Sequence, residues 1–115
     1  MSHDAFVRGA RLFDAGEFFR AHEAWEERWL VETDAASRRM FQGLIQIAAA
    51  FHKLVVVGNA ESAARLLAKG LAKLDGFDDP IAGASLARFC RETRAFASAL
   101  TLGSFDPSAI PKLSV

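Results

Sequence analysis

The sequence predicts an all-α protein, a single domain over residues 1–115, in which about five helices form a bundle of helical hairpins with a Pro-containing C-terminal tail. Three observations favour this fold class. Alternating apolar and polar runs, which are typical of β-strands, are nearly absent, whereas apolar residues recur at steps of three and four. Residues that start or stop helices punctuate the chain at helix-length intervals. A length of 115 residues is that of one domain with its own core.

The boundaries of the helices follow from residues that commonly cap or end them. In chain order, we expect helices over residues 3–15, 18–31, 35–57, 60–75 and 81–102. The expected entry residues of the last three are, in order, Asp34, Asn59 and Asp79-Pro80, and the expected stops are Gly16, Gly58, Gly76 and Gly103. The remainder, "SFDPSAIPKLSV", contains two prolines and is expected to lie extended on the bundle.

The apolar patterns predict which helices are buried. The third helix is apolar over most of its circumference, which predicts that it is the central helix. The fourth carries Ala60, Ala63 and Ala64 on one face, where small side chains should allow a close approach between helices. The fifth has a continuous apolar seam that includes Cys90, so we expect this thiol to be a small buried hydrophobe.

Composition limits the classes of partner. Fourteen basic and fourteen acidic side chains balance, so neither a nucleic acid nor an anionic membrane is indicated. Residues 40–57 are the most apolar stretch, but Gln42, Gln46, His52 and Lys53 interrupt it, which argues against a membrane span. One cysteine and no signal peptide suggest the cytoplasm. Zero net charge leaves a homodimer or a protein partner open.

The second helix carries the most informative pattern. Taking about 100° per residue from Phe18, Trp25 lies about 20° to one side, and a set of residues lies between about 20° and 120° on the other. This set consists of Trp29, His22, Glu26, Phe19 and Leu30. The charged residues Glu17, Arg20, Glu27 and Arg28 fall on the opposite side. We therefore expect His22 and Glu26 to lie inside the apolar arc.

A buried imidazole and carboxylate need partners. An unpaired buried charge costs several kcal/mol, so Glu26 must be paired, coordinated or protonated. His22 is one turn away on the same face, with Cβ atoms about 6 Å apart. The two side chains could bind one divalent metal ion together, form a metal-free acid–base or small-ligand site, or be a purely structural hydrogen-bonded pair.

The stretch "HEAWEERW" resembles the motif His-x-x-x-Glu-x-x-Trp/Tyr of the bacterial and archaeal domain-of-unknown-function family 309. The flanking "LFDAGEFFRAHEAWEERW" and "FQGLIQIAAAFHKLVVVGN" resemble that family's two most characteristic stretches. The likeness covers about residues 10–70 and is fainter beyond. It implies a small all-helical fold and a motif, here His22, Glu26 and Trp29, that has been suggested to bind metal.

Further site residues must come from elsewhere in the chain. His52 points from the third helix toward the core and could reach the site, or it could be an ordinary core histidine. Gln42 and Gln46 are either solvated or hydrogen-bond to the site residues. The remaining candidates are Glu23 as a reserve ligand, Trp29 as an apolar wall, and Trp25 as core or pocket wall.

The chemistry stays open between two classes. Glu26 stands where a His-Glu-x-x-His metalloprotease has its second histidine, and the paired Glu-x-x-His segments of di-iron bundles are absent, so neither enzyme is indicated. One hypothesis is a metal- or small-ligand-binding protein, with or without enzymatic activity. The other is a helical interaction module or homodimer, in which His22 and Glu26 form a structural polar pair.

Overall fold

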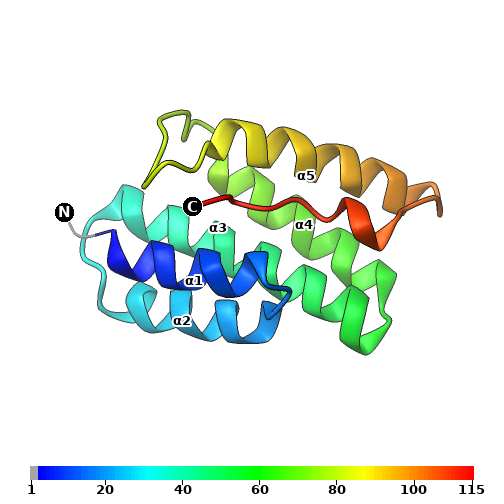
Figure 1. The fold of residues 1–115 in the computed structure, drawn as a ribbon, viewed down its shortest axis with the longest axis horizontal. Coiled ribbons are helices and arrows are strands. Elements are labelled where there is room, and N and C mark those ends of the chain that lie inside the picture. Colours follow the sequence, from blue (N-terminus) through cyan, green and yellow to red (C-terminus); the bar gives the residue numbers. More distant parts are fainter. Residues whose placement is uncertain (1–2) are drawn as a thin grey trace.

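The computed structural model describes residues 3–115 and begins with a helical hairpin (Figure 1). Helix α1 spans Asp4–Asp14 and α2 spans Phe18–Val31. Gly16 lies between them with φ +82°, a left-handed conformation that glycine adopts without strain. Trp25 of α2 is 0% exposed and donates a hydrogen bond from Nε1 to the carbonyl of Phe6, at 3.2 Å. A buried hydrogen bond therefore joins the two helices of the hairpin within their apolar interface.

Helix α3 spans Ala35–His52 and continues as a π-helix, η1, over Lys53–Val57. The Asp34 side chain accepts a hydrogen bond from the Ser37 backbone N–H, and Gly58 ends the helix at φ +77°. The combined helix Ala35–Val57 is long and apolar enough to cross a membrane by length and composition alone, contrary to our expectation from its polar interruptions. However, half of its most apolar window is buried, and α3 packs between α2 and α4, as the predicted central helix does.

Helix α4 spans Ala60–Leu74, is capped by the Asn59 side chain, and crosses α3 at two glycines. A Cβ on Gly70 would lie 2.7 Å from the Gly43 carbonyl oxygen, and one on Gly43 would lie 3.0 Å from that of Gly70. The expected close approach is thus present at two glycines, and of the predicted alanines Ala63 is fully buried whereas Ala60 is exposed.

Helix α5 spans Leu86–Thr101, and the prediction that it begins at residue 81 is wrong. Ile81 and Ala84 exchange two backbone hydrogen bonds across a tight turn. Its central residues, Ala82 and Gly83, have φ +50° and +85°, which an α-helix excludes. The helix starts instead where the Ser85 hydroxyl accepts from the Arg88 N–H. The apolar seam, including buried Cys90, is confirmed.

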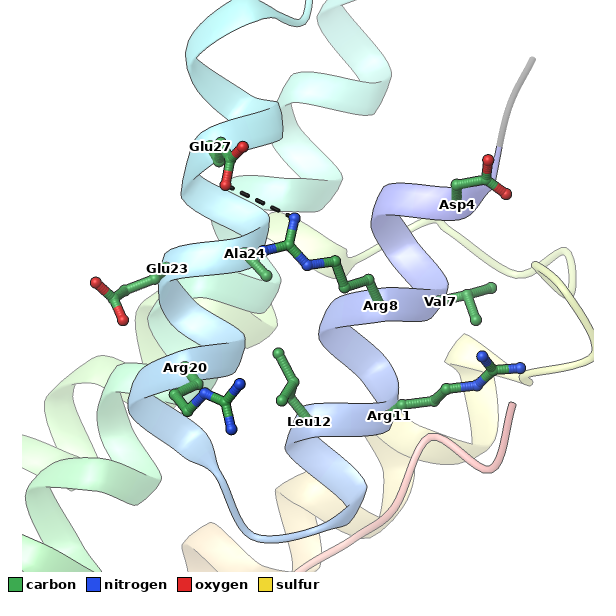
Figure 2. A pocket seen from close by; sticks show the side chains of 9 residues that line it. All are labelled: Asp4, Val7, Arg8, Arg11, Leu12, Arg20, Glu23, Ala24 and Glu27. Carbon is green, nitrogen blue, oxygen red and sulfur yellow. Dashed lines mark ion pairs between the residues drawn. The ribbon is translucent and has the colours of Figure 1, made fainter.

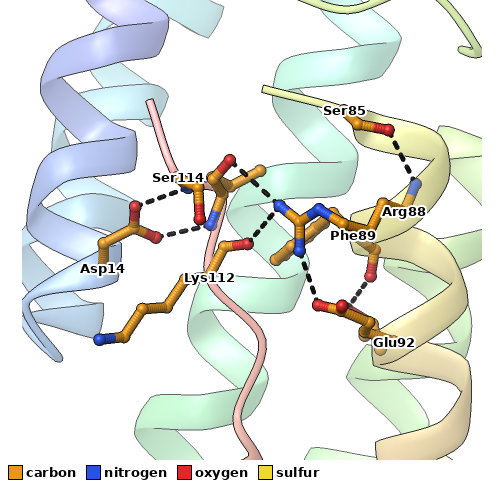
Figure 3. A network of polar contacts seen from close by, with 9 residues as sticks. Asp14, Ser85, Arg88, Phe89, Glu92, Lys112 and Ser114 are labelled. Carbon is orange, nitrogen blue, oxygen red and sulfur yellow. Dashed lines mark hydrogen bonds and ion pairs between the residues drawn. The ribbon is translucent and has the colours of Figure 1, made fainter. Parts of the chain in front are cut away.

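The C-terminal tail runs back between α1 and α5 and contains a short 3₁₀ turn, η2, over Pro107–Ala109 (Figure 1). Asp14 accepts hydrogen bonds from the backbone N–H groups of Leu113, at 2.7 Å, and Ser114, at 2.8 Å. On the other side, Arg88 donates to the carbonyls of Lys112 and Leu113 (Figure 3). Leu113 itself is 0% exposed, so the tail is part of the packed structure.

The core is built around edge-to-face contacts between phenylalanines from different helices. Phe13 of α1 packs edge-on against Phe51 of α3, at 5.8 Å between ring centroids, and against Phe89 of α5, at 5.6 Å. Phe51 in turn contacts Phe96. Within residues 3–115 there are five α-helices and no β-strand, which confirms the predicted all-α class.

Candidate functional site

Helix α2 turns a different face to the core from the one predicted. Its buried residues are Phe18, Ala21, Ala24 and Trp25. Phe19 and Leu30, which helped to define the predicted arc, are 52% and 65% exposed. The arc is centred on the alanines because α1 packs closely against them.

As a consequence, the predicted pair of His22 and Glu26 lies at the edge of the buried face of α2, which we call its shoulder. The side chain of His22 is 25% exposed and that of Glu26 is 47% exposed. The expectation that both groups lie inside the arc is therefore wrong for Glu26 and only partly right for His22. A carboxylate that is half in water keeps its charge without a buried counter-ion, so Glu26 carries little of the expected desolvation cost.

The two side chains face one another across one helical turn. His22 Nε2 lies 3.7 Å from Glu26 Oε2, which is within ion-pair range but longer than a hydrogen bond. Of the two neutral tautomers of this ring, the one with its proton on Nε2 directs an N–H toward the carboxylate. The other ring nitrogen, Nδ1, then presents a lone pair.

That nitrogen is one of two buried polar atoms without a hydrogen-bond partner in the described part of the chain. The other is Oε1 of Gln46, on α3. The antiparallel helices α2 and α3 place Phe19 against His52 and Trp29 against Arg38. This register sets Gln46 beside the turn of α2 that carries His22 and Glu26. Both unpaired atoms therefore belong to one seam between the two helices.

A pocket of about 270 Å³ opens in this seam. It is lined by Phe19, His22, Ala49, His52, Lys53 and Val57. The Phe19 ring stacks on His22, at 5.9 Å and 16° between ring planes, and also contacts His52, at 5.3 Å. The π-helix η1 begins at Lys53, on the pocket wall, and such segments often occur at functional sites. We call these six residues the seam pocket.

The other predicted site residues are placed as follows. Gln42 lies one turn before Gln46 and is half-buried. Trp29 lies under the guanidinium of Arg38, at 4.3 Å, while Arg38 also donates to the Trp29 carbonyl, at 2.8 Å. Trp29 thus fixes the end of α2 and is not among the residues that line the seam pocket. Trp25 points to α1 and belongs to the core.

Glu23 lies on the far side of α2, in an open groove against α1 (Figure 2). In this groove, Arg8 reaches toward α2 and pairs with Glu27 at 3.7 Å, whereas Arg11 points away from α2 (Figure 2). The groove is lined by both signs of charge, so it has no single electrostatic preference. Glu23 lines this groove and not the seam pocket.

The donor set matters for the metal hypothesis. No group of three or more His, Cys, Asp or Glu side chains that could hold a metal ion is found among residues 3–115. Resident zinc sites normally have three or four such ligands. His22 and Glu26 supply two, and Gln46 supplies a weaker amide oxygen. These residues do not fit a resident zinc or iron ion held by this chain alone.

Two comparisons place the chain among known sequences. Residues 6–66 match the family described as a domain of unknown function (DUF309), and this range contains most of α1, all of α2, α3 and η1, and the start of α4. The chain is also similar to an uncharacterised protein of Aquifex aeolicus (strain VF5), with 31% identity over 74 residues. That alignment covers 64% of this chain and 22% of the Aquifex protein. The matched range includes both sides of the seam pocket.

Proposed function

We propose that this chain, which belongs to the DUF309 family, binds a small neutral ligand in the seam pocket through His22, and that the ligand extends to Gln46, which lies outside the pocket lining, one turn before the lining residue Ala49 on α3. The observation that carries the proposal is the pair of buried, unpaired atoms, His22 Nδ1 and Gln46 Oε1, on the two sides of one seam. Buried polar atoms are nearly always hydrogen-bonded, and each that is not costs about 1–3 kcal/mol. A protein tolerates such a cost where a ligand supplies the missing partner.

The chemistry of the two atoms indicates the ligand group. With the His22 proton on Nε2, toward Glu26, both Nδ1 and the amide oxygen are hydrogen-bond acceptors. The ligand must therefore donate, and a primary carboxamide or a hydroxyl group does so. Phe19 and Val57 provide apolar walls, and the Phe19 ring offers a face for a flat ligand. An aryl carboxamide combines these features.

A divalent metal ion is the second candidate for the same place, because both unpaired atoms also present lone pairs to a cation. With two or three donors from this chain, the remaining ligands would have to come from water or from a bound molecule. The Lys53 ammonium lines the same pocket and would repel a divalent cation, which favours the neutral ligand.

The experiment uses benzamide and N,N-dimethylbenzamide, which share the ring but differ in N–H donors. We expect benzamide to shift ¹⁵N–¹H resonances around Phe19 and Ala49, and the dimethyl compound to leave them unchanged. Gln46→Met keeps the length of the side chain and removes the oxygen, so it should abolish binding. It should also raise the free energy of unfolding by about 1 kcal/mol, since an unpaired buried oxygen is lost. Glu23→Gln, in the other groove, is the control.

The outcome separates function from structure. If Gln46→Met and His22→Phe both destabilise the protein, and the wild type binds neither benzamide nor N,N-dimethylbenzamide, the polar groups are structural and the proposal fails. Titration with Zn²⁺ and Mn²⁺ tests the second candidate: binding that is lost in both variants, without benzamide binding, would replace the neutral ligand by a metal.

Self-association is a separate candidate, favoured by apolar surface beside the seam pocket. Val55, Val56 and Val57 of η1 are 53%, 68% and 55% exposed, and Phe19 is exposed nearby. Grouped exposed apolar side chains often mark a protein contact. Sedimentation velocity of the wild type and of Val56→Asp tests this: a dimer that the substitution dissociates supports self-association, and a monomeric wild type at high concentration excludes it.

A further inference from the structure

A second pocket, of about 370 Å³, lies at the other end of α2. Here the start of α1, the end of α2, the start of α3 and the α4–α5 connection come together, at the end of the molecule where the chain begins (Figure 1). Its apolar lining consists of Phe6, Met40, Phe41, Phe77 and Ile81. We call this cavity the end pocket. It shares no residue with the seam pocket.

The floor and the outer wall of the end pocket differ in packing. Phe6, Met40 and Phe41 belong to the core and are at most 6% exposed. Phe77 and Ile81 are only half-buried, on the connection between α4 and α5. A flat apolar ligand would therefore extend the core outward and cover the half-buried side chains of Phe77 and Ile81. The flexible Met40 side chain can adapt to its shape.

The outer wall is fixed in place. The Arg39 guanidinium lies over the Phe77 ring, at 5.1 Å, and donates to the carbonyls of Lys73 and Asp75 at the end of α4. Ile81 is held by the turn that pairs it with Ala84. The cavity is thus formed by ordered contacts, so binding a ligand does not first require this wall to fold.

The charged rim has an excess of negative charge. Arg28 pairs with Glu32, at 3.0 Å, and the second Glu32 oxygen accepts from the backbone N–H groups of Thr33 and Asp34. The hydrogen bond from Arg28 lowers the pKa of Glu32, and that from the Ser37 N–H lowers the pKa of Asp34. Both carboxylates are therefore ionised near neutral pH. Among the lining residues, Arg28 is the one Lys or Arg beside the two carboxylates, His3 is the remaining titratable group, and no ion pair joins Asp34 to a basic side chain within residues 3–115.

We infer that the end pocket is a second binding site, which takes a small aryl-alkyl amine with its ring among Phe6, Met40 and Phe41 and its ammonium group near Asp34. The size fits, since pockets for small molecules commonly start at about 300 Å³. The charge complementarity selects the amine over a carboxylate with the same apolar body. The helix ends nearby do not reverse this preference, because the start of α3 is already met by Asp34 and the end of α2 by Arg38.

The test compares three probes with one body: 4-phenylbutylamine, 4-phenylbutanol and 4-phenylbutyrate. Dissociation constants from ¹⁵N–¹H chemical-shift titrations should rank the amine tightest and the carboxylate weakest. Asp34→Asn keeps a good helix cap but removes the charge. It should weaken amine binding by about two- to fivefold, the size of an exposed ion pair, and leave the alcohol unchanged.

A matched pair of substitutions tests the location. Ala36 lines the end pocket and Ala35 does not, although both are exposed in the first turn of α3. Ala36→Trp should fill the mouth and reduce amine binding at least about tenfold, while Ala35→Trp should bind like the wild type. Equal amine binding by the two variants overturns the site, and alcohol or carboxylate binding as tight as the amine overturns the ligand class. Benzamide binding at the seam pocket should be unaffected throughout.

Discussion

Replacing Gly9 with alanine should destabilise the protein strongly, although alanine is the better helix former. Gly9 lies in α1 directly opposite Trp25, and a Cβ at this position would overlap the indole ring. Trp25 is fully buried and donates its N–H to the Phe6 carbonyl. The ring must move, so the variant loses packing, about 1–3 kcal/mol, and strains or breaks a buried hydrogen bond, about 1–3 kcal/mol more. The gain in helix propensity offsets about 1 kcal/mol.

The net expectation is a loss of about 3 kcal/mol in the free energy of unfolding, measured by urea denaturation, and a fall in Tm of roughly 10 °C. Arg8→Gly and Arg8→Ala, at the exposed neighbouring position, measure the helix-propensity part in the same turn. Trp25→Ala removes the whole obstructing ring, so Gly9→Ala should cost much less in that background. A Gly9→Ala variant as stable as the wild type, or costs that simply add in the double variant, would refute the proposed contact.

Three further predictions concern other parts of the fold. Leu113→Ala should cost about 2–4 kcal/mol in urea denaturation, because this tail residue is fully buried, whereas exposed Val115→Ala should change stability by less than about 0.5 kcal/mol. Since the Arg28 hydrogen bond lowers the pKa of Glu32, its stabilisation is complete above the ordinary value of 4.5 and disappears as the pH falls through the lower folded value. The stability difference between wild type and Glu32→Gln should therefore shrink in acid and stay constant above about pH 6. Burial raises the pKa of the Cys90 thiol, so its reaction with a disulfide reagent should be far slower in the folded than in the urea-unfolded protein.

The sequence predicted the first four helices to within one residue at each end, because their limits are set by local chemistry. Asp34 and Asn59 accept hydrogen bonds from the first turns of α3 and α4, and Gly58 adopts the left-handed conformation that ends the long helix. The change to a π-helix inside that long helix had no recognisable signal. The fifth helix was predicted to start five residues too early, because Pro80 is a common first residue of helices.

The orientation of α2 could not be predicted from its own residues. Large apolar side chains were used to centre the buried arc, but two of them, Phe19 and Leu30, are exposed. The buried side includes Ala21 and Ala24 beside Trp25, and α1 lies so close to this side that Gly9 leaves no room for a Cβ next to the Trp25 ring. That approach is a contact between helices, and no periodicity within one helix reports it.

The motif His22, Glu26 and Trp29 can be understood as one stripe along the shoulder of α2, with each residue meeting α3 differently. At its C-terminal end, Trp29 supports Arg38, which binds the last carbonyls of α2 and so fixes the angle between the two helices. In the middle, Glu26 stays half in water and lies 3.7 Å from His22 Nε2. At the N-terminal end, His22 is left with a buried acceptor facing the seam. A fully buried stripe would have forced the imidazole and the carboxylate to satisfy one another. On the shoulder, the carboxylate is satisfied by water, and the imidazole is free to bind something else.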